Sequence, residues 1–169
     1  MRYSYRFFIV CICFALISGC SSYEDQLSTG DTARDFRLNT HGRERFYLNQ
    51  HKGKVVVLVF WATWCVICKN ELIELKSYSR MVKEKELVVA GICTDPENNN
   101  NLHEIIKNLE IDYPTLLDKG AEVYSKYNIK ALPTTIIIDR ESRVSFIREG
   151  YNPTIKKQIK SRVENLLYQ

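Results

Sequence analysis

Hydrophobic positions along the chain fall into short runs with two different spacings. Unbroken apolar runs, rich in β-branched residues, cover 55–60, 87–92 and 134–138. Runs of this length and composition are typical of strands buried on both faces of a sheet. A strict alternation of apolar and polar residues between Asp35 and Leu48, broken by a turn at 40–42, predicts a short β-hairpin.

Other segments repeat their apolar residues every three or four positions, which predicts amphipathic helices. This spacing predicts a helix through 72–85, a second one over 102–109 and a short one over 121–127. A last helix is expected from Pro153, because Asn152 is a good N-cap and proline suits the first turn.

The order of these elements predicts an α/β domain over residues 31–169. Alternating strands and helices imply a parallel strand pair joined by a right-handed crossover. A tight turn at 139–142 would make the following strand, 143–148, run antiparallel to its neighbour. We therefore expect a mixed central β-sheet flanked by helices, with an N-terminal β-hairpin and an extra strand/helix insertion between the central strands.

The N-terminus has the layout of a secretory signal. Arg2 and Arg6 precede an unbroken apolar run, 7–17, and small residues lead to Cys20. The run is too short to span a bilayer as a helix. We predict a lipoprotein-type signal peptide at 1–19, followed by a lipidated Cys20 and a tether, 20–30; the alternative is a generic signal or an uncleaved anchor, in which Cys20 is incidental.

Loss of the signal changes the charge and the cysteine inventory. The 169-residue chain carries six cysteines and a formal net charge of +4, and removing Arg2 and Arg6 lowers that charge to +2. No dense cluster of basic residues with interleaved aromatics is present, so we expect no nucleic-acid partner. The predicted compartment lies outside the cytoplasm, where disulfides persist. Apart from a lipidated Cys20, the mature chain would keep Cys65, Cys68 and Cys93.

Cys65 and Cys68 are the candidate reactive pair. Cys65 follows a predicted buried strand and begins a predicted helix. Unpaired N–H groups and the positive end of the helix dipole stabilise a thiolate at that position. Cys68 lies one turn further on and is expected to be more buried. The sequence therefore predicts that Cys65 is the nucleophile, that Cys68 resolves the mixed disulfide, and that the two form a redox disulfide.

The sequence leaves four other uses of this pair to compare. A structural zinc site needs four ligands, and the mature domain offers one cysteine pair, Cys93 and three scattered histidines, so we expect no metal and no cofactor. A thiol peroxidase is suggested by Thr63-Trp64-Cys65, although the threonine is one position too close for the peroxiredoxin pattern. A static disulfide would close too small a loop to stabilise the fold much. A non-catalytic thiol- or metal-binding adaptor is the alternative that is not an enzyme.

A substrate groove is predicted beside the dithiol. Pro133 follows Leu132 and opens a strand, and with the dithiol in the same chain we predict that the Leu132–Pro133 bond is cis, because X-Pro bonds tolerate cis at low cost. The backbone of Leu132 could then pair with an extended substrate as an added strand. The alternative is a trans proline at the start of an edge strand. Trp64 is expected to form part of the rim of this site, and Trp61 to pack beneath it.

Taken together, residues 60–71 and the downstream 132–135 resemble the TlpA/ResA-like branch of the thioredoxin superfamily. The resemblance extends over roughly 28–169. It implies a thioredoxin-like fold and an extracytoplasmic, often membrane-tethered, thiol-disulfide oxidoreductase that acts on disulfide-bearing proteins, in some relatives during cytochrome c maturation. It also implies a membrane thiol-electron donor of the DsbD/CcdA type. We expect a monomer.

The chain departs from this family at two positions. Ile73 stands where many relatives have a proline, and Val59 stands where thioredoxins carry a buried aspartate. Without that aspartate, Glu71 is the best remaining acid, because it lies one turn beyond Cys68 on the same helix face. We predict that Glu71 relays the proton of Cys68; the alternative is a solvated helix glutamate. Cys93 is expected to be a core thiol.

Overall fold

The structure is a computed structural model that describes residues 26–81, 86–96 and 101–168. The predicted signal peptide, the lipidation of Cys20 and most of the tether lie outside the described residues and stay predictions. Within the described ranges, no helix has the length and apolar character needed to cross a membrane.

The described strands form one seven-stranded sheet in the order β2-β1-β5-β4-β3-β6-β7. β3 and β4 run parallel, β4 and β5 run parallel, and the remaining neighbours are antiparallel. The strands are β1 Arg37–Thr40, β2 Arg45–Tyr47, β3 Val55–Trp61, β4 Leu87–Cys93, β5 Thr115–Leu117, β6 Thr134–Ile138 and β7 Val144–Glu149.

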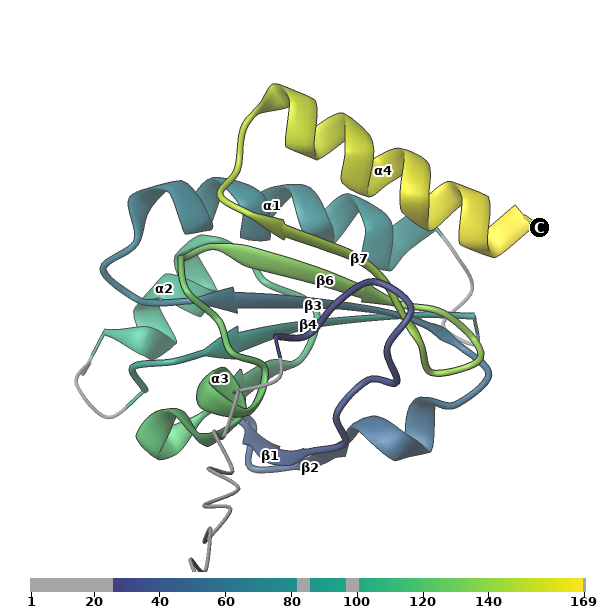
Figure 1. Cartoon of the computed structure of the whole chain (residues 1–169). Coiled ribbons are helices and arrows are strands. Elements are labelled where there is room, and N and C mark those ends of the chain that lie inside the picture. Colours follow the sequence, from purple (N-terminus) through teal and green to yellow (C-terminus); the bar gives the residue numbers. More distant parts are fainter. Residues whose placement is uncertain (1–25, 82–85, 97–100, 169) are drawn as a thin grey trace, which may run out of the picture.

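Helices cover both faces of this sheet (Figure 1). α1 and α4 lie side by side on one face, whereas α3 lies toward the other, where side chains of the β1–β2 hairpin, which forms one edge of the sheet, join the core. The helices are α1 Val66–Met81, α2 Leu102–Asn108, α3 Glu122–Lys126 and α4 Pro153–Tyr168, and two 3₁₀ turns occupy η1 Leu48–His51 and η2 Lys119–Ala121.

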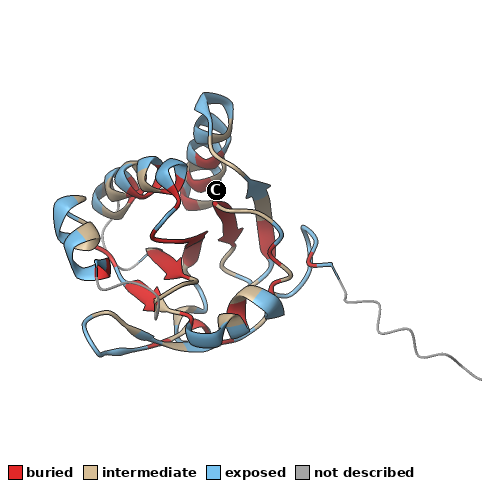
Figure 2. Cartoon of the chain, turned by 90° about the vertical axis from the view of Figure 1, so that its left-hand side faces the viewer, coloured by how far each residue is buried: buried red, intermediate tan, exposed pale blue. Residues whose placement is uncertain are grey.

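The central strand β3 divides the core into two halves. Successive side chains of a strand point to opposite faces. Those of Val55, Val57, Val59 and Trp61 accordingly join the cluster under α1 and α4, and the alternate ones join the cluster over the hairpin. All seven residues of β3 are buried, in agreement with their unbroken apolar sequence. Figure 2 shows the buried positions gathered between the layers.

The predicted α/β class, the N-terminal hairpin and the mixed sheet are confirmed. The insertion between the central strands β4 and β6 consists of α2, β5 and α3. β5 was not located by the sequence pattern, because a three-residue strand is too short to show a period. It pairs with β4 on one side and β1 on the other, and so joins the hairpin to the central sheet.

The N-cap of α4 gives a first testable prediction. Asn152 Oδ1 accepts hydrogen bonds from the backbone N–H groups of Thr154 and Ile155, both at 2.9 Å. Replacing an asparagine cap by alanine costs about 1 kcal/mol. We expect Asn152→Ala to lower the free energy of unfolding by that amount in urea titrations. Asn152→Asp should keep most of the stabilisation that the cap provides. An unchanged midpoint in the alanine variant would show that the cap contributes nothing.

Candidate active site

A four-residue connection carries the first cysteine. β3 ends at Trp61, and α1 begins at Val66, so Cys65 is the residue immediately before the helix. The N–H of Cys65 donates to the carbonyl of Ala62 at 3.0 Å and closes a turn. The placement of Cys65 at the start of a helix, predicted from the sequence, is therefore what the structure shows.

Cys65 and Cys68 are joined by a disulfide of 2.05 Å with a Cα–Cα distance of 5.3 Å. Both are buried, Cys68 completely and Cys65 at 5% exposure, so the second cysteine is the less accessible of the two. The backbone N–H of Cys68 points at Cys65 Sγ at 3.3 Å. The same N–H is positioned to stabilise negative charge on that sulfur when the pair is reduced.

The start of α1 favours a thiolate electrostatically. Its first turn contains no acidic residue, so no side chain there opposes the positive end of the helix dipole. Lys69, which follows Cys68 directly in the sequence, is the first charged residue of α1 and is basic. A cysteine in such surroundings is a better nucleophile at neutral pH than a free thiol.

The surface around the disulfide is apolar. Trp64, Val66 and Ile67 are 71%, 73% and 46% exposed, although large apolar side chains are usually buried. All three come from the connection and the first turn of α1, and they flank the two cysteines in the sequence. Exposed apolar groups gathered at a reactive centre indicate a surface that another molecule covers.

The Leu132–Pro133 peptide bond is cis. The carbonyl of Pro133 accepts from Gly150 N–H at 2.7 Å, and the carbonyl of Ala131 accepts from Thr134 Oγ1 at the same distance. Among the described residues, no loop or ladder hydrogen bond uses the backbone of Leu132. These backbone groups stay available to an added strand.

Glu71 is buried inside the protein. Its side chain is 1% exposed, so it is not the solvated glutamate that was the alternative. Oε1 accepts a short hydrogen bond from Thr135 Oγ1, whereas Oε2 has no partner. Burial raises the pKa of Glu71 from 4.5 to about 7, against the opposing effect of the Thr135 hydrogen bond. A carboxyl with a pKa near 7 can both take up and release a proton at physiological pH.

Thr135 is a site residue that sequence reasoning did not identify. In the register of the sheet it stands opposite Val59, the position where thioredoxins carry a buried aspartate. Glu71 therefore reaches from α1 to the rung of the sheet where that aspartate would be. The signal that could have found Thr135 is its place two residues after Pro133, on the strand that pairs with β3.

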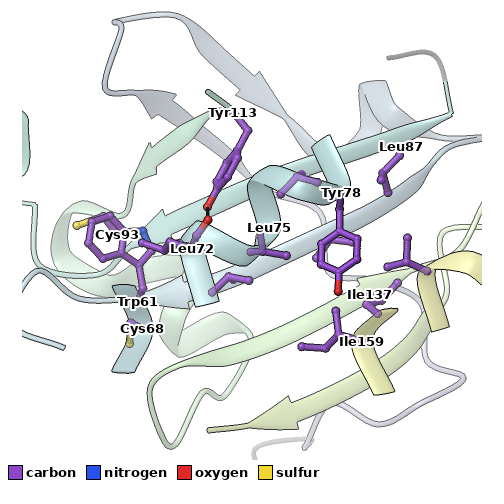
Figure 3. Close-up of a cluster of buried hydrophobic side chains, with 14 of the residues drawn as sticks. Trp61, Cys68, Leu72, Leu75, Tyr78, Leu87, Cys93, Tyr113, Ile137 and Ile159 are labelled. Carbon is purple, nitrogen blue, oxygen red and sulfur yellow. Dashed lines mark hydrogen bonds between the residues drawn. The ribbon is translucent and has the colours of Figure 1, made fainter. Parts of the chain in front are cut away.

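Cys93 is a core thiol, as expected. It is fully buried beside Trp61, at the end of the cluster that also holds Cys68 (Figure 3). Burial raises the pKa of the Cys93 thiol to about 12, so it stays protonated and is a poor nucleophile. Within the described ranges, no group of three or more His, Cys, Asp or Glu side chains is placed to hold a metal ion.

The hydroxyl of Thr63, which suggested the peroxidase alternative, is engaged elsewhere. Thr63 Oγ1 donates to Asp95 Oδ2, and Thr63 N–H donates to Asp95 Oδ1 at 2.9 Å. The hydroxyl proton is therefore directed at the end of β4 and not at a peroxide bound to Cys65. The geometry does not favour peroxide chemistry.

Residues 29–147 match the AhpC/TSA family over more than half of the chain. The chain belongs to the AhpC/TSA family. The family match and the relatives below are consistent with the TlpA/ResA-like resemblance and confirm the thioredoxin-like fold.

The chain is also similar to three thiol-disulfide proteins. It is 28% identical to thiol-disulfide oxidoreductase ResA of Bacillus cereus, over 90% of this chain and 87% of ResA. A Chlorobium tepidum structure assigned as thiol:disulfide interchange protein DsbE has a TM-score of 0.78 and 25% identity, and 84% of this chain covers 99% of that one. The exposed lipoprotein thioredoxin Etrx1 of Streptococcus pneumoniae has a TM-score of 0.68 and 25% identity, with coverages of 79% and 100%. With its Cys65–Cys68 pair, this AhpC/TSA protein is a thiol-disulfide oxidoreductase of the ResA/DsbE type.

Proposed function

We propose that this protein reduces or exchanges disulfides of extracytoplasmic proteins while anchored to a membrane by lipid on Cys20. The observation that carries the exchange reaction is the Cys65–Cys68 disulfide, set at the start of α1 beneath the exposed Trp64, Val66 and Ile67. The similarity to the TlpA/ResA-like branch supports a place for this exchange in the maturation of c-type cytochromes.

The reaction runs in two displacements. The Cys65 thiolate attacks one sulfur of the substrate disulfide, forms a mixed disulfide and releases a substrate thiolate. Cys68 then loses its proton to the Glu71 carboxylate and attacks Cys65 Sγ. The second substrate sulfur leaves as a thiolate, the Cys65–Cys68 disulfide forms, and two electrons have passed to the substrate. A membrane thiol-electron donor of the DsbD/CcdA type restores the dithiol by the reverse exchange.

The substrate binds as an extended segment along Leu132 and Pro133. The unused backbone groups of Leu132 pair with it, and Trp64 covers it from the side of the connection. Because the flanking side chains are apolar, we propose that the residues next to the substrate cysteine are apolar too.

Turnover tests this function. Wild-type protein is given a dithiol donor and insulin as the disulfide substrate, and in parallel a dithiol donor and hydrogen peroxide. We expect catalysed insulin reduction and no peroxide consumption above the uncatalysed rate. Peroxide consumption without insulin reduction would support the thiol peroxidase instead, and the absence of both would support the adaptor.

Anchoring needs a separate test. We expect the full chain, expressed in a bacterium, to incorporate labelled fatty acid and to sediment with membranes. Cys20→Ala should abolish the label. A labelled Cys20→Ala protein, or an unlabelled wild type, would contradict lipidation at Cys20, whatever the outcome of the turnover test.

Trp64→Ala tests the docking surface. We expect kcat/KM for a protein substrate to fall about tenfold, as for an exposed aromatic anchor at an interface, and the rate with a small-molecule disulfide to stay unchanged. Tyr168→Ala is the matched control, because Tyr168 is 76% exposed at the far end of α4 (Figure 1). Equal losses in the two variants would remove Trp64 from the docking surface.

A further inference from the structure

Asp95 lies beyond the end of β4, next to the connection that carries Cys65. In the parallel pairing of β3 with β4, Trp61 stands opposite Cys93. Thr63 lies two residues after Trp61, and Asp95 lies two residues after Cys93. Because the two strands are parallel, Thr63 and Asp95 leave the sheet at the same end, next to each other. The Asp95 carboxylate accepts two hydrogen bonds from Thr63: Oδ1 accepts from the Thr63 N–H, and Oδ2 accepts from the Thr63 hydroxyl.

These contacts hold in place the segment of chain that leads from β3 to Cys65. The residue before Asp95 adds two more bonds, because Thr94 N–H and Thr94 Oγ1 both donate to the carbonyl of Trp61, at 2.9 and 3.2 Å. The turn that follows is closed by Cys65 N–H and the Ala62 carbonyl. The connection is thus tied to the end of β4 up to Thr63, two residues before the nucleophile.

The carboxylate also lies on the Cys93 side of the site. Cys93 Sγ is 3.4 Å from Asp95 Oδ1, and this thiol stays neutral, so it donates to the carboxylate without cancelling its charge. The other charged or titratable groups that the start of α1 brings to the site are Lys69 and the buried Glu71. Asp95 therefore adds a negative charge near Cys65. Two residues separate Cys65 from Thr63, and one hydrogen bond joins Thr63 to Asp95, so the carboxylate lies within about 10 Å of Cys65.

We propose that Asp95 is a positioning residue for the exchange reaction. It holds Cys65 in place through Thr63, and its negative charge makes the Cys65–Cys68 pair more reducing. A negative charge near Cys65 disfavours its thiolate. Destabilising the reduced form lowers the reduction potential, as the converse arrangement raises it in strongly oxidising proteins. The inference rests on the exchange function proposed above, and it names a residue that gives that function its direction.

Two substitutions separate the charge from the contacts. Asp95→Asn keeps an oxygen for Thr63 N–H and an amide for the Thr63 hydroxyl, but removes the charge. Asp95→Ala removes both. Thr63→Val keeps the charge and removes one contact, and Asp112→Asn is a matched control, because it neutralises a different carboxylate, bonded to Ser79 and Arg80.

The reduction potential is measured for each variant in glutathione buffers, followed by kcat and KM for insulin reduction. We expect Asp95→Asn to shift the equilibrium about tenfold toward the dithiol, or about 30 mV upward, while Thr63→Val and Asp112→Asn stay at the wild-type value. We expect Asp95→Ala to lower kcat about tenfold with KM unchanged. A wild-type potential in Asp95→Asn, an equal shift in Asp112→Asn, or a wild-type kcat in Asp95→Ala overturns the proposal. A wild type without exchange activity would instead overturn the function itself.

Discussion

Cys68→Ser protein incubated with a disulfide substrate is expected to accumulate a covalent complex with it. Cys65 can still attack, but the side chain that would release the mixed disulfide is gone. Turnover should fall by about three orders of magnitude or more, as it does when other enzymes lose a reactive group. The complex should be visible as a band that non-reducing electrophoresis resolves and dithiothreitol removes.

Cys65→Ser is the matched comparison. It should lose turnover to the same extent but form no complex, because Cys68 is fully buried and cannot reach a substrate. Cys93→Ser should keep turnover, since that thiol is buried and stays protonated. If Cys65→Ser trapped substrate and Cys68→Ser did not, the two roles would be reversed. If Cys93→Ser abolished turnover in a folded protein, the two-cysteine mechanism would be wrong.

The second large effect concerns Glu71 and pH. The pKa of Glu71 is raised from 4.5 to about 7 in the folded protein by burial, so the folded state holds this proton more tightly than the unfolded chain does. The resulting stability is fully present below about pH 4.5 and is lost as the pH rises through about 7. The shift corresponds to about 3 kcal/mol of unfolding free energy.

Glu71→Gln isolates this contribution, because glutamine is neutral at every pH. We expect the variant to gain about 3 kcal/mol relative to wild type between pH 4.5 and pH 8, as measured by urea unfolding of the oxidised proteins. Glu74→Gln is the matched control three residues further along α1, where the carboxylate is partly exposed and paired with Lys156. Parallel pH curves for wild type and Glu71→Gln would show that Glu71 ionises normally.

The same substitution should slow the second displacement. Without a carboxylate to accept the proton of Cys68, the mixed disulfide should persist about a hundredfold longer, at the lower end of what general bases contribute. The wild-type rate should rise with pH through about 7, and the variant should lack that inflection. A Glu71→Gln protein that resolves its mixed disulfide at the wild-type rate would remove Glu71 from the mechanism.

Much of the fold could be predicted because its longest strands are buried on both faces. An uninterrupted apolar run, such as that of β3, leaves few alternatives to a central strand. The hairpin and α4 carried their own turn and cap residues. β5 could not be predicted, because its three residues take their strand conformation from pairing with β1 and β4 and not from a local pattern.

The candidate site likewise has residues that the sequence predicts and residues that only the fold brings together. Cys65, Cys68 and Glu71 are separated by single helical turns, so their proximity follows from the sequence of α1. Thr135 bonds Glu71 from 64 positions away, and Asp95 bonds Thr63 from 32 positions away, through the register of β3 with β6 and β4. Sequence reasoning identified the reactive groups, and the structure was needed to find the residues that adjust them.

The reduction potential of the Cys65–Cys68 pair tests the account most directly. Equilibration of the wild-type protein with glutathione buffers, followed by counting the free thiols of this pair, gives the value. A reductant with an acidic residue behind its nucleophile should equilibrate near about −270 mV, in the range of thioredoxin. A value near about −120 mV, in the range of strong disulfide donors, would contradict the account.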